Sequence, residues 1–249
     1  LQSRLLKSTE AISWVAELEP DLLVLAFVTS FVPKEMIDLA PRGGINYHPS
    51  LLPKYRGGSA INWAIINGET ETGVSIHYID EGVDTGPVLL QESVVIEPDD
   101  TVKSVYFEKL YPMGIRMIGE AVELIKNDRG TALAQDETLA SFQPVITAND
   151  TVIDWHKPTA EIYNLIRGAN PAPGATSTIN EMGCKIFDTS SGSGAGAAGT
   201  VIGISDKAIE IATSDGSLFV HVLQPAGSKK IPAAEFVQSF QIKLGDVFN

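Results

Sequence analysis

The segment Ile45–Pro53, with the sequence INYHPSLLP, decides how the fold of this chain is interpreted. It follows an apolar stretch and places an amide, Asn46, two residues before an imidazole, His48. In a strand, residues two apart lie on the same face, so both side chains can face one crevice. Downstream, Asp84 lies on a turn flanked by glycines. An amide, an imidazole and a carboxylate brought together can polarise a carbonyl, move a proton and orient the imidazole, which predicts acyl transfer to an amine.

The length and composition are those of a folded chain with a substantial core. The 249 residues can form one large domain or two modest ones, and 44% of them are hydrophobic. No apolar run approaches the roughly 20 residues that span a bilayer, so we expect no membrane partner. The single cysteine, Cys184, cannot form an internal disulfide, which favours a reducing compartment and predicts a cytoplasmic location.

The acidic charge argues against nucleic-acid binding through a field over the whole surface. The formal net charge is −13. Residues 1–150 hold 11 Lys and Arg against 22 Asp and Glu, a net of −11, whereas residues 151–249 hold 7 against 9, a net of −2. The second half can therefore carry a local basic patch, and the adjacent Lys229 and Lys230 are its most visible part. A solvated lysine pair on a turn is the alternative interpretation.

The first part of the chain alternates between strand-like and helix-like patterns. Such alternation predicts an open, mostly parallel α/β sheet of the Rossmann-like kind, and we assign it to a domain of residues 1–145. In such sheets ligands bind beyond the carboxyl ends of the strands, where Asn46 and His48 lie. Strands are expected at residues 22–28, 44–48, 73–79 and 88–96, and helices at residues 1–17, 33–39, 59–67 and 101–125.

The remaining residues, 146–249, have a different pattern. One helix is expected near residues 159–167, followed by short β-rich runs separated by glycine-containing turns. Short strands at regular spacing predict a small β-barrel domain. The Gly, Ala and Ser stretch at residues 190–199 is flanked by strand-like sequence on both sides, which favours a loop inside this domain over a linker between domains.

Three motifs together resemble the formyltransferases that use 10-formyltetrahydrofolate. They are Asn46-x-His48, the run Ser50–Gly57 (SLLPKYRG) and the run Gly82–Gly86 (GVDTG). The resemblance continues to the run Leu223–Lys230 (LQPAGSKK) and so covers nearly the whole chain. The family includes methionyl-tRNA formyltransferases, and the hydrolase domain of 10-formyltetrahydrofolate dehydrogenase is also similar. The resemblance implies a C-terminal barrel of the OB-like kind, and a first sheet that is N-terminally incomplete in this chain.

The resemblance also implies roles for individual residues. Asn46 and protonated His48 would stabilise the oxyanion, and Asp84 would orient His48 and help to remove the amine proton. The formyl donor would be 10-formyltetrahydrofolate, and no metal site is expected, because the four histidines do not fall at ligand spacings. The residues expected to contact the folate are Ser30, Phe31, Val32, Ser50, Leu51, Leu52, Pro53, Asp80, Gly82 and Val83.

The motifs leave the formyl acceptor open. The amino group of initiator methionyl-tRNA is the first expectation, because the C-terminal run with Lys229 and Lys230 matches that branch best. The acidic net charge and Pro49, which resembles the hydrolase domain and some sugar formyltransferases, favour a nucleotide-linked amino sugar or water. A folate-binding module without activity is the alternative from a different class, and the intact Asn46, His48 and Asp84 speak against it.

Overall fold

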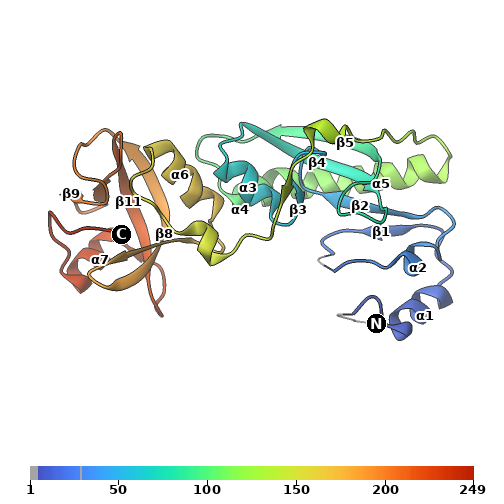
Figure 1. Cartoon of the computed structure of the whole chain (residues 1–249), viewed down its shortest axis with the longest axis horizontal. Helices are drawn as coiled ribbons and strands as arrows, with labels where there is room; N and C mark the ends of the chain where they lie inside the picture. The colour runs from blue at the N-terminus through green and yellow to red at the C-terminus, as the bar shows by residue number, and fades with distance from the viewer. Residues whose placement is uncertain (1–4, 29) are drawn as a thin grey trace. The chain divides into compact units, whose positions relative to one another are not determined.

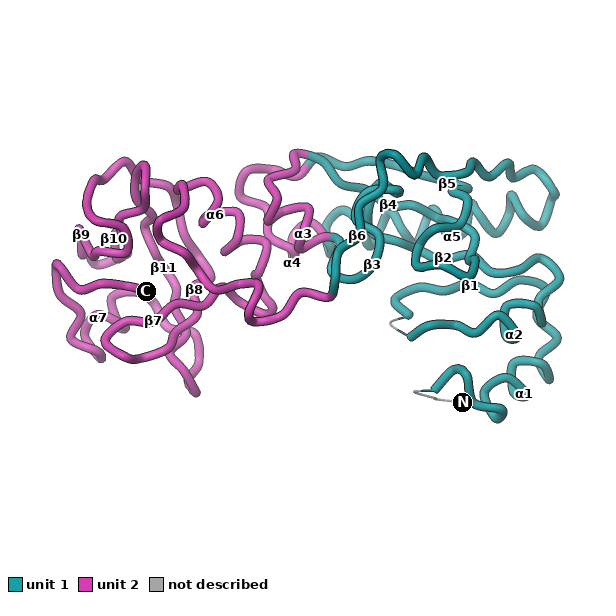
Figure 2. Tube along the Cα trace, in the orientation of Figure 1, with its two compact units in different colours: residues 1–60, 71–95, 106–144 teal, residues 61–70, 96–105, 145–249 magenta. Residues whose placement is uncertain are grey.

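The computed structural model describes residues 5–28 and 30–249 (Figure 1). The chain folds into two compact units, which are coloured separately in Figure 2. Each unit combines segments that are distant in the sequence. The first unit comprises residues 1–60, 71–95 and 106–144, and the second comprises residues 61–70, 96–105 and 145–249.

The first unit contains a four-stranded sheet in the order β1-β2-β4-β5. Only β1 and β2 run parallel; β2 with β4 and β4 with β5 are antiparallel, so the expectation of a mostly parallel sheet is wrong for these described strands. A parallel pair needs a long crossover, whereas β4 and β5 are joined by the short loop of residues 79–87, which allows only an antiparallel pair. The strands are β1 (Leu23–Leu25), β2 (Gly44–His48), β4 (Glu71–Tyr78) and β5 (Val88–Val95).

Helices of the first unit follow the apolar periodicity in outline. Ser8 caps α1 (Thr9–Glu17) by accepting a hydrogen bond from the Ala11 amide, so this helix is shorter than expected; residues 1–4 of the predicted helix lie outside the described residues. A short α2 spans Lys34–Ile37. The long helix α5 (Tyr111–Lys126) packs against β4 and β5 (Figure 1). A Cβ at Gly114 of α5 would collide with the Tyr47 ring on β2, so glycine permits this close packing.

The helix expected over residues 101–125 is divided into three parts. It begins as α4 (Val102–Ser104), continues as the π-helical η1 (Val105–Leu110) and ends as α5. Thr101 caps it, since its hydroxyl accepts from the Ser104 amide while the Ser104 hydroxyl accepts from the Thr101 amide. Three shorter elements belong to the first unit: β3 (Arg56–Gly57), η2 (Glu137–Leu139) and β6 (Phe142–Gln143). Most of α3 (Ala60–Ile66) and all of η3 (Ala148–Thr151) belong to the second unit.

The second unit contains an antiparallel sheet in the order β7-β8-β11-β10-β9, with β12 paired to β11. Residues 193–199 of the Gly, Ala and Ser stretch lie between β8 and β9 of this sheet, which confirms a loop inside this unit, whereas residues 190–192 belong to β8. The strands are β7 (Ala175–Ile179), β8 (Met182–Gly192), β9 (Val201–Ile204), β10 (Ile209–Ala212), β11 (Ser217–Pro225) and β12 (Ile231–Pro232). Two α-helices, α6 (Thr159–Gly168) and α7 (Ala233–Phe240), lie in the same stretch of the chain as these strands.

The last residues of the chain pair with segments near both ends of this strand order. Phe248 forms an antiparallel bridge with Ile179 at the end of β7, and Val247 forms one with Thr200 just before β9. Phe248 and Phe236 are nearly fully buried in an apolar core that includes residues of β8, β11 and α6. Within the described part of the chain, no helix is long and apolar enough to cross a membrane.

Candidate active site

Strand pairing brings the predicted amide and imidazole to one face of the first sheet. Asn46 and His48 are two residues apart on β2. On the neighbouring antiparallel strand β4, Asn46 lies opposite His77 and His48 lies opposite Ser75. All four belong to the first unit, so this face of β2 and β4 carries a strip of polar side chains.

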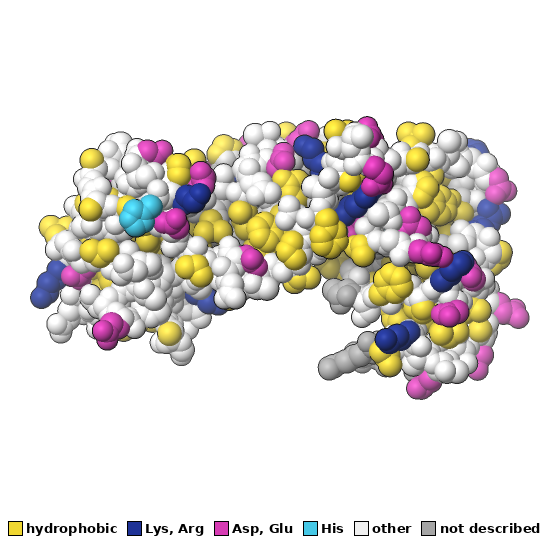
Figure 3. Space-filling model, viewed as in Figure 1, with side chains coloured by type: hydrophobic (Ala, Val, Ile, Leu, Met, Phe, Trp, Pro, Cys, Tyr) yellow, Lys and Arg dark blue, Asp and Glu magenta, His cyan; other side chains and the backbone are white. Residues whose placement is uncertain are grey.

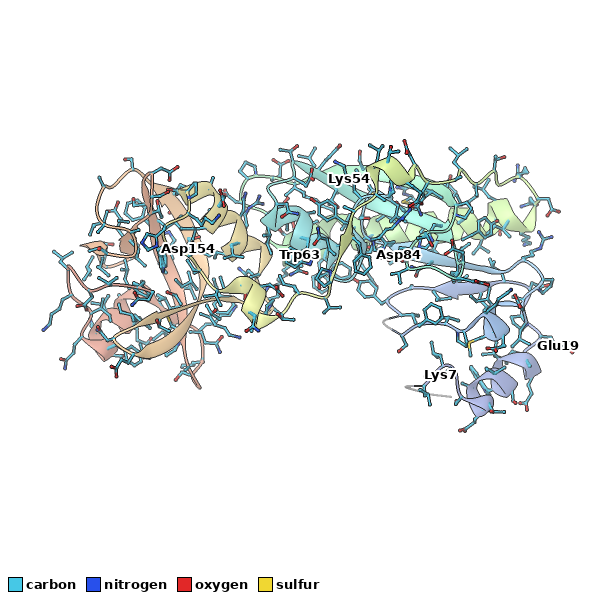
Figure 4. The ribbon with its side chains drawn as sticks, viewed as in Figure 1. Lys7, Glu19, Lys54, Trp63, Asp84 and Asp154 are labelled. Carbon is cyan, nitrogen blue, oxygen red and sulfur yellow. The ribbon has the colours of Figure 1, made fainter. Side chains whose placement is uncertain are left out.

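The loop of residues 79–87 brings Asp84 to these side chains (Figure 4, where Asp84 is labelled). Asp84 has a left-handed backbone, with φ of 54°, and a Cβ at Gly86 would collide with the Tyr78 carbonyl oxygen. The loop therefore needs glycine at position 86 and strain at position 84 to make its tight turn. Gln135 stabilises this turn because its Nε2 donates to the carbonyl oxygens of Asp84 at 2.8 Å and of Gly86 at 2.7 Å.

Both oxygens of the Asp84 carboxylate have two polar neighbours. Oδ2 accepts from the Gly57 amide at 2.9 Å and lies 3.4 Å from His48 Nδ1. Oδ1 accepts from Asn46 Nδ2 at 3.3 Å and lies 3.4 Å from His77 Nε2. The structure thus brings Asn46, His48 and Asp84 together. Burial favours the neutral carboxyl, but the contact with His77, the charge of His48 and the Gly57 N–H hold the pKa of Asp84 below its usual range.

His48 is 4% exposed, and both of its ring nitrogens have partners. Nε2 lies 2.8 Å from the Tyr55 carbonyl oxygen, which can only accept, so Nε2 carries a proton. Burial lowers the pKa of His48, and Asp84 and the Tyr55 carbonyl oppose that shift. A proton arriving at Nδ1 would meet the Asp84 carboxylate, so Asp84 is placed to orient this ring and to stabilise its charge.

Three further residues at the site were not predicted from the sequence. His77 is 3% exposed and faces Asp84. Arg56 is 7% exposed and forms an ion pair with Glu137 at 2.7 Å, while its Nε and Nη2 donate to Gln135, the residue that stabilises the Asp84 turn. The polar residues Ser75 and His77, alternating within an apolar run, are the available signal for His77. No local signal identifies Gln135, which is 51 residues from Asp84.

The predicted folate-contacting turn after His48 is held by its own hydrogen bonds. The Ser50 hydroxyl donates to the Lys54 carbonyl at 2.7 Å, and the Leu52 amide donates to the Ser75 hydroxyl at 3.1 Å. Ser50 and Leu52 are buried, whereas Leu51 and Pro53 are half-buried. These hydrogen bonds hold the turn in place directly after His48, and its more accessible side chains are Leu51 and Pro53.

The other predicted folate contacts lie on loops. Ser30 and Phe31 are exposed, whereas Val32 is buried in a small apolar cluster with Ala11 and Met36. In the loop before Asp84, Asp80 Oδ1 accepts from the Gly82 amide at 3.0 Å and from the Thr85 hydroxyl at 2.6 Å. Val83 is 49% exposed and Phe31 is 65% exposed, so these two present apolar surface to solvent.

The described residues contain no metal-binding group, and the cavity of the second unit is not lined by residues of the predicted site. Among residues 5–28 and 30–249, no group of three or more His, Cys, Asp or Glu side chains is arranged to hold a metal ion. A cavity of about 480 Å³ lies in the second unit beside Cys184 and Lys185, and none of its lining residues belongs to the predicted site. Burial raises the pKa of Cys184 to about 12, so the thiol stays protonated and is not a nucleophile.

Asp84 and the three side chains beside it, Asn46, His48 and His77, form a cluster that we call the Asp84 cluster. It has the groups that acyl transfer to an amine requires. Asp84 is ionised and can accept a proton, His48 is oriented by that carboxylate, and Asn46 supplies an amide N–H. The amide and the imidazole are donors for an oxygen that becomes negative in a tetrahedral intermediate. The arrangement therefore favours attack by a neutral amine on an activated carbonyl.

Comparison with known proteins gives the same chemistry. Residues 1–112 match the model of a family described as formyl transferase, and residues 145–241 match its C-terminal domain. Methionyl-tRNA formyltransferase from Trichlorobacter lovleyi is 39% identical over 239 residues, which is 96% of this chain and 75% of that protein.

Similar solved structures include two that hold a folate. HypX from Aquifex aeolicus in complex with tetrahydrofolic acid superposes with a TM-score of 0.75 at 23% identity, over 94% of this chain and 42% of that chain. This chain therefore spans less than half of HypX, and the likeness concerns the fold. An N-formyltransferase from Helicobacter canadensis in complex with folinic acid and dTDP-3-aminofucose has a TM-score of 0.60 at 25% identity, over 76% of this chain and 69% of that chain.

Proposed function

The chain belongs to the formyl transferase family, and from this premise we propose that it transfers a formyl group from 10-formyltetrahydrofolate to the amino group of methionyl-tRNA. The observation that carries the proposal is the Asp84 carboxylate held between His48 at 3.4 Å and Asn46 at 3.3 Å. The relative from Trichlorobacter lovleyi, which is named methionyl-tRNA formyltransferase and aligns over nearly the whole chain, supports this acceptor.

The catalytic roles follow from the atoms that the cluster presents. The amine nitrogen attacks the formyl carbon, and the carbonyl oxygen becomes negative. Asn46 and protonated His48 donate hydrogen bonds to that oxygen. Each first gives up one of the hydrogen bonds that it makes in the unliganded structure, because such bonds rearrange when substrate binds. Asp84 keeps His48 oriented and accepts the amine proton. The C–N bond to the folate then breaks and its nitrogen takes up a proton.

Exposed apolar side chains of the first unit fit a folate donor. Phe31 and Val83 expose hydrophobic side chains in the first unit, and a flat pterin ring is bound by such surfaces with a few backbone polar groups. We assign the pterin to the loop Asp80–Val83 and to Ser30–Val32, and the rest of the folate to the turn Ser50–Pro53. The folinic acid in the Helicobacter canadensis N-formyltransferase supports a folate donor for this family.

The domain organisation is part of the proposal. We place the catalytic domain at residues 1–145 and the C-terminal domain at residues 146–249. The antiparallel order β7-β8-β11-β10-β9, with Phe248 bridged to Ile179 and Val247 bridged to Thr200, supports a closed barrel of the OB-like kind. The lone cysteine, Cys184, supports a cytoplasmic location.

The second unit supplies the candidate surface for tRNA. Lys229 and Lys230 are exposed, and Lys230 Nζ lies 3.3 Å from the centroid of the Phe187 ring. On the face seen in Figure 3, Lys and Arg side chains lie among Asp and Glu rather than in one field. A tRNA contact must therefore be local, and the lysine pair is the place to test it.

An acceptor assay tests the function. The protein is incubated with 10-formyltetrahydrofolate and, in separate reactions, with methionyl-tRNA, a nucleotide-linked amino sugar or buffer alone, and folate release is measured. We expect release to require methionyl-tRNA. Release with the amino sugar alone would replace tRNA by the acceptor class of the Helicobacter canadensis enzyme, and equal release in buffer would indicate hydrolysis.

A salt series tests the acceptor independently. Phosphate contacts make affinity fall with salt, with a slope of about −0.9 or less per contact. The double variant Lys229→Glu and Lys230→Glu should weaken the apparent affinity for methionyl-tRNA by about tenfold or more. This is the effect expected when about two phosphate contacts are lost. Lys243→Glu, an exposed lysine of the same unit, is the matched control. A flat salt response in wild type and double variant alike would remove tRNA as the acceptor.

A further inference from the structure

His77 and His48 contact different oxygens of the Asp84 carboxylate. Its Nε2 lies 3.4 Å from Asp84 Oδ1, whereas His48 Nδ1 lies 3.4 Å from Oδ2. The two imidazole centroids are 6.4 Å apart, so the carboxylate lies against two rings. His77 is 3% exposed, so its imidazole meets the ionised carboxylate of Asp84 away from solvent.

The second ring nitrogen of His77, Nδ1, bonds to a backbone carbonyl, and this bond determines which nitrogen can gain or lose a proton. Nδ1 lies 2.8 Å from the Tyr78 carbonyl oxygen, and a carbonyl can only accept, so Nδ1 carries a proton in both charge states. Nε2 is consequently the position that gains or loses a proton. In the neutral ring Nε2 is an acceptor, and in the charged ring it is a donor.

Nε2 has a suitable partner for each state. Asn46 Nδ2 lies 3.3 Å from it and can donate to the neutral ring. Asp84 Oδ1, at 3.4 Å, accepts only and suits the protonated ring. Asn46 and His77 are direct neighbours across the β2–β4 pair, so the backbone register holds this geometry. A change in the protonation of His77 therefore changes which of the two groups it binds.

We propose that His77 receives, through Asp84, the proton that the attacking amine loses, and that this moves His77 from Asn46 to Asp84 and frees an Asn46 N–H for the formyl oxyanion. The inference rests on the proposed formyl transfer. The amine nitrogen bonds to the formyl carbon, its proton passes to the Asp84 carboxylate and then to His77 Nε2. When the bond between the formyl carbon and the folate nitrogen breaks, the proton returns through Asp84 to that nitrogen.

His48 cannot take this proton while it donates to the oxyanion. Its Nε2 exchanges the Tyr55 carbonyl for the oxyanion, while its protonated Nδ1 stays on Asp84 and has no lone pair with which to accept. Among the described residues, the titratable side chains recorded beside His77 are Asp84, in the loop after β4, and His48, on β2. Asp84, at 3.4 Å from His77 Nε2, gives the proton a short route. His77 acts through Asp84 and Asn46 and is a positioning residue.

His77→Gln tests the proton transfer. Gln can accept an Asn46 N–H but cannot store a proton, so we expect kcat to fall by about tenfold to a hundredfold while the KM for the amine changes little. The kcat–pH profile of the variant should also differ from that of wild type, because the variant has no imidazole at this position. Ile76→Val, a buried neighbour on β4, is the control for strand disturbance and should keep the wild-type pH profile.

Combination with Asp84→Asn separates this role from a structural one. If the proton reaches His77 only through Asp84, His77→Gln should cost less than about twofold in kcat in the Asp84→Asn background. Independent, multiplying effects, or a His77→Gln variant with the kcat and pH profile of wild type, would overturn the inference. A wild-type protein that formylates no amine would instead count against the proposed function.

A measurement without turnover tests the protonation geometry. Nitrogen-15 spectra of the histidine-labelled protein should show neutral His77 with its proton on Nδ1, and His77→Gln identifies the signal. A neutral ring with its proton on Nε2 would overturn the inference, because that nitrogen could not accept from Asp84.

Discussion

The interiors of the two units differ in the side chains that they bury. The first buries two imidazoles, His48 and His77, around one carboxylate, and every one of these groups has a polar partner. The apolar core of the second unit is built on large side chains such as Phe236, Phe248 and Trp155, and its one thiol stays protonated. Both units bury partnered polar groups, among them Arg167 in the second, but only the face of β2 and β4 places two buried imidazoles against one carboxylate among the described residues. Buried polar groups are costly unless they are partnered, so this face is where chemistry is expected.

The largest expected effect is on the apolar side of this comparison. Phe236→Ala should lower the free energy of unfolding by about 3–5 kcal/mol, because it removes a fully buried aromatic ring and leaves a cavity. Urea unfolding followed by circular dichroism measures it. The folded variant should keep the catalytic groups of the first unit intact. A loss below about 1 kcal/mol would mean that the core of the second unit can collapse around the gap.

On the polar side, His48→Gln should lower kcat by about a hundredfold, which is roughly 2.7 kcal/mol of transition-state stabilisation. The reason is that Gln cannot carry the charge that Asp84 stabilises on the imidazole. Steady-state kinetics with 10-formyltetrahydrofolate measure it, with His156→Gln, an exposed histidine of the second unit, as the control. Equal activity of the two variants would remove His48 from the mechanism.

Cys184→Ser should have a smaller effect, and on stability alone. It places a hydroxyl where a buried thiol packs, which costs about 1–2 kcal/mol when no new hydrogen bond forms. Turnover should stay at the wild-type level, because a thiol whose pKa is raised to about 12 takes no part in catalysis. A folded but inactive serine variant would transfer the chemistry to the second unit and contradict the comparison.

The smallest expected effect is the pH dependence of stability. Burial lowers the pKa of His48 in the folded state, so the unfolded chain binds more protons below its usual pKa of about 6.5. Stability should therefore fall as pH decreases below that value. His48→Gln should reduce this fall by less than about 4 °C in Tm, the shift that roughly 1 kcal/mol produces in a chain of this size. An unchanged slope would show that His48 titrates alike in both states.

Much of the site could be predicted from local sequence, and the rest could not, for identifiable reasons. Alternation on one strand placed Asn46 and His48 on a common face, and glycines marked the turn that carries Asp84. The antiparallel pairing of β2 with β4 was not predicted, because a continuous apolar run does not reveal strand direction. His77 faces Asn46 only through that register, and Gln135 reaches Asp84 from a distant segment, so neither had a local signal strong enough to assign it.

The central claim is that the carboxylate of Asp84 organises formyl transfer, and Asp84→Asn tests it most directly. The substitution keeps the shape of the side chain but removes the charge that both imidazoles contact. The initial rate of formyl transfer from 10-formyltetrahydrofolate to methionyl-tRNA is measured for wild type and variant at matched folded concentration. The rate should fall by about a hundredfold or more. A folded Asp84→Asn protein that transfers formyl groups at the wild-type rate would contradict the claim.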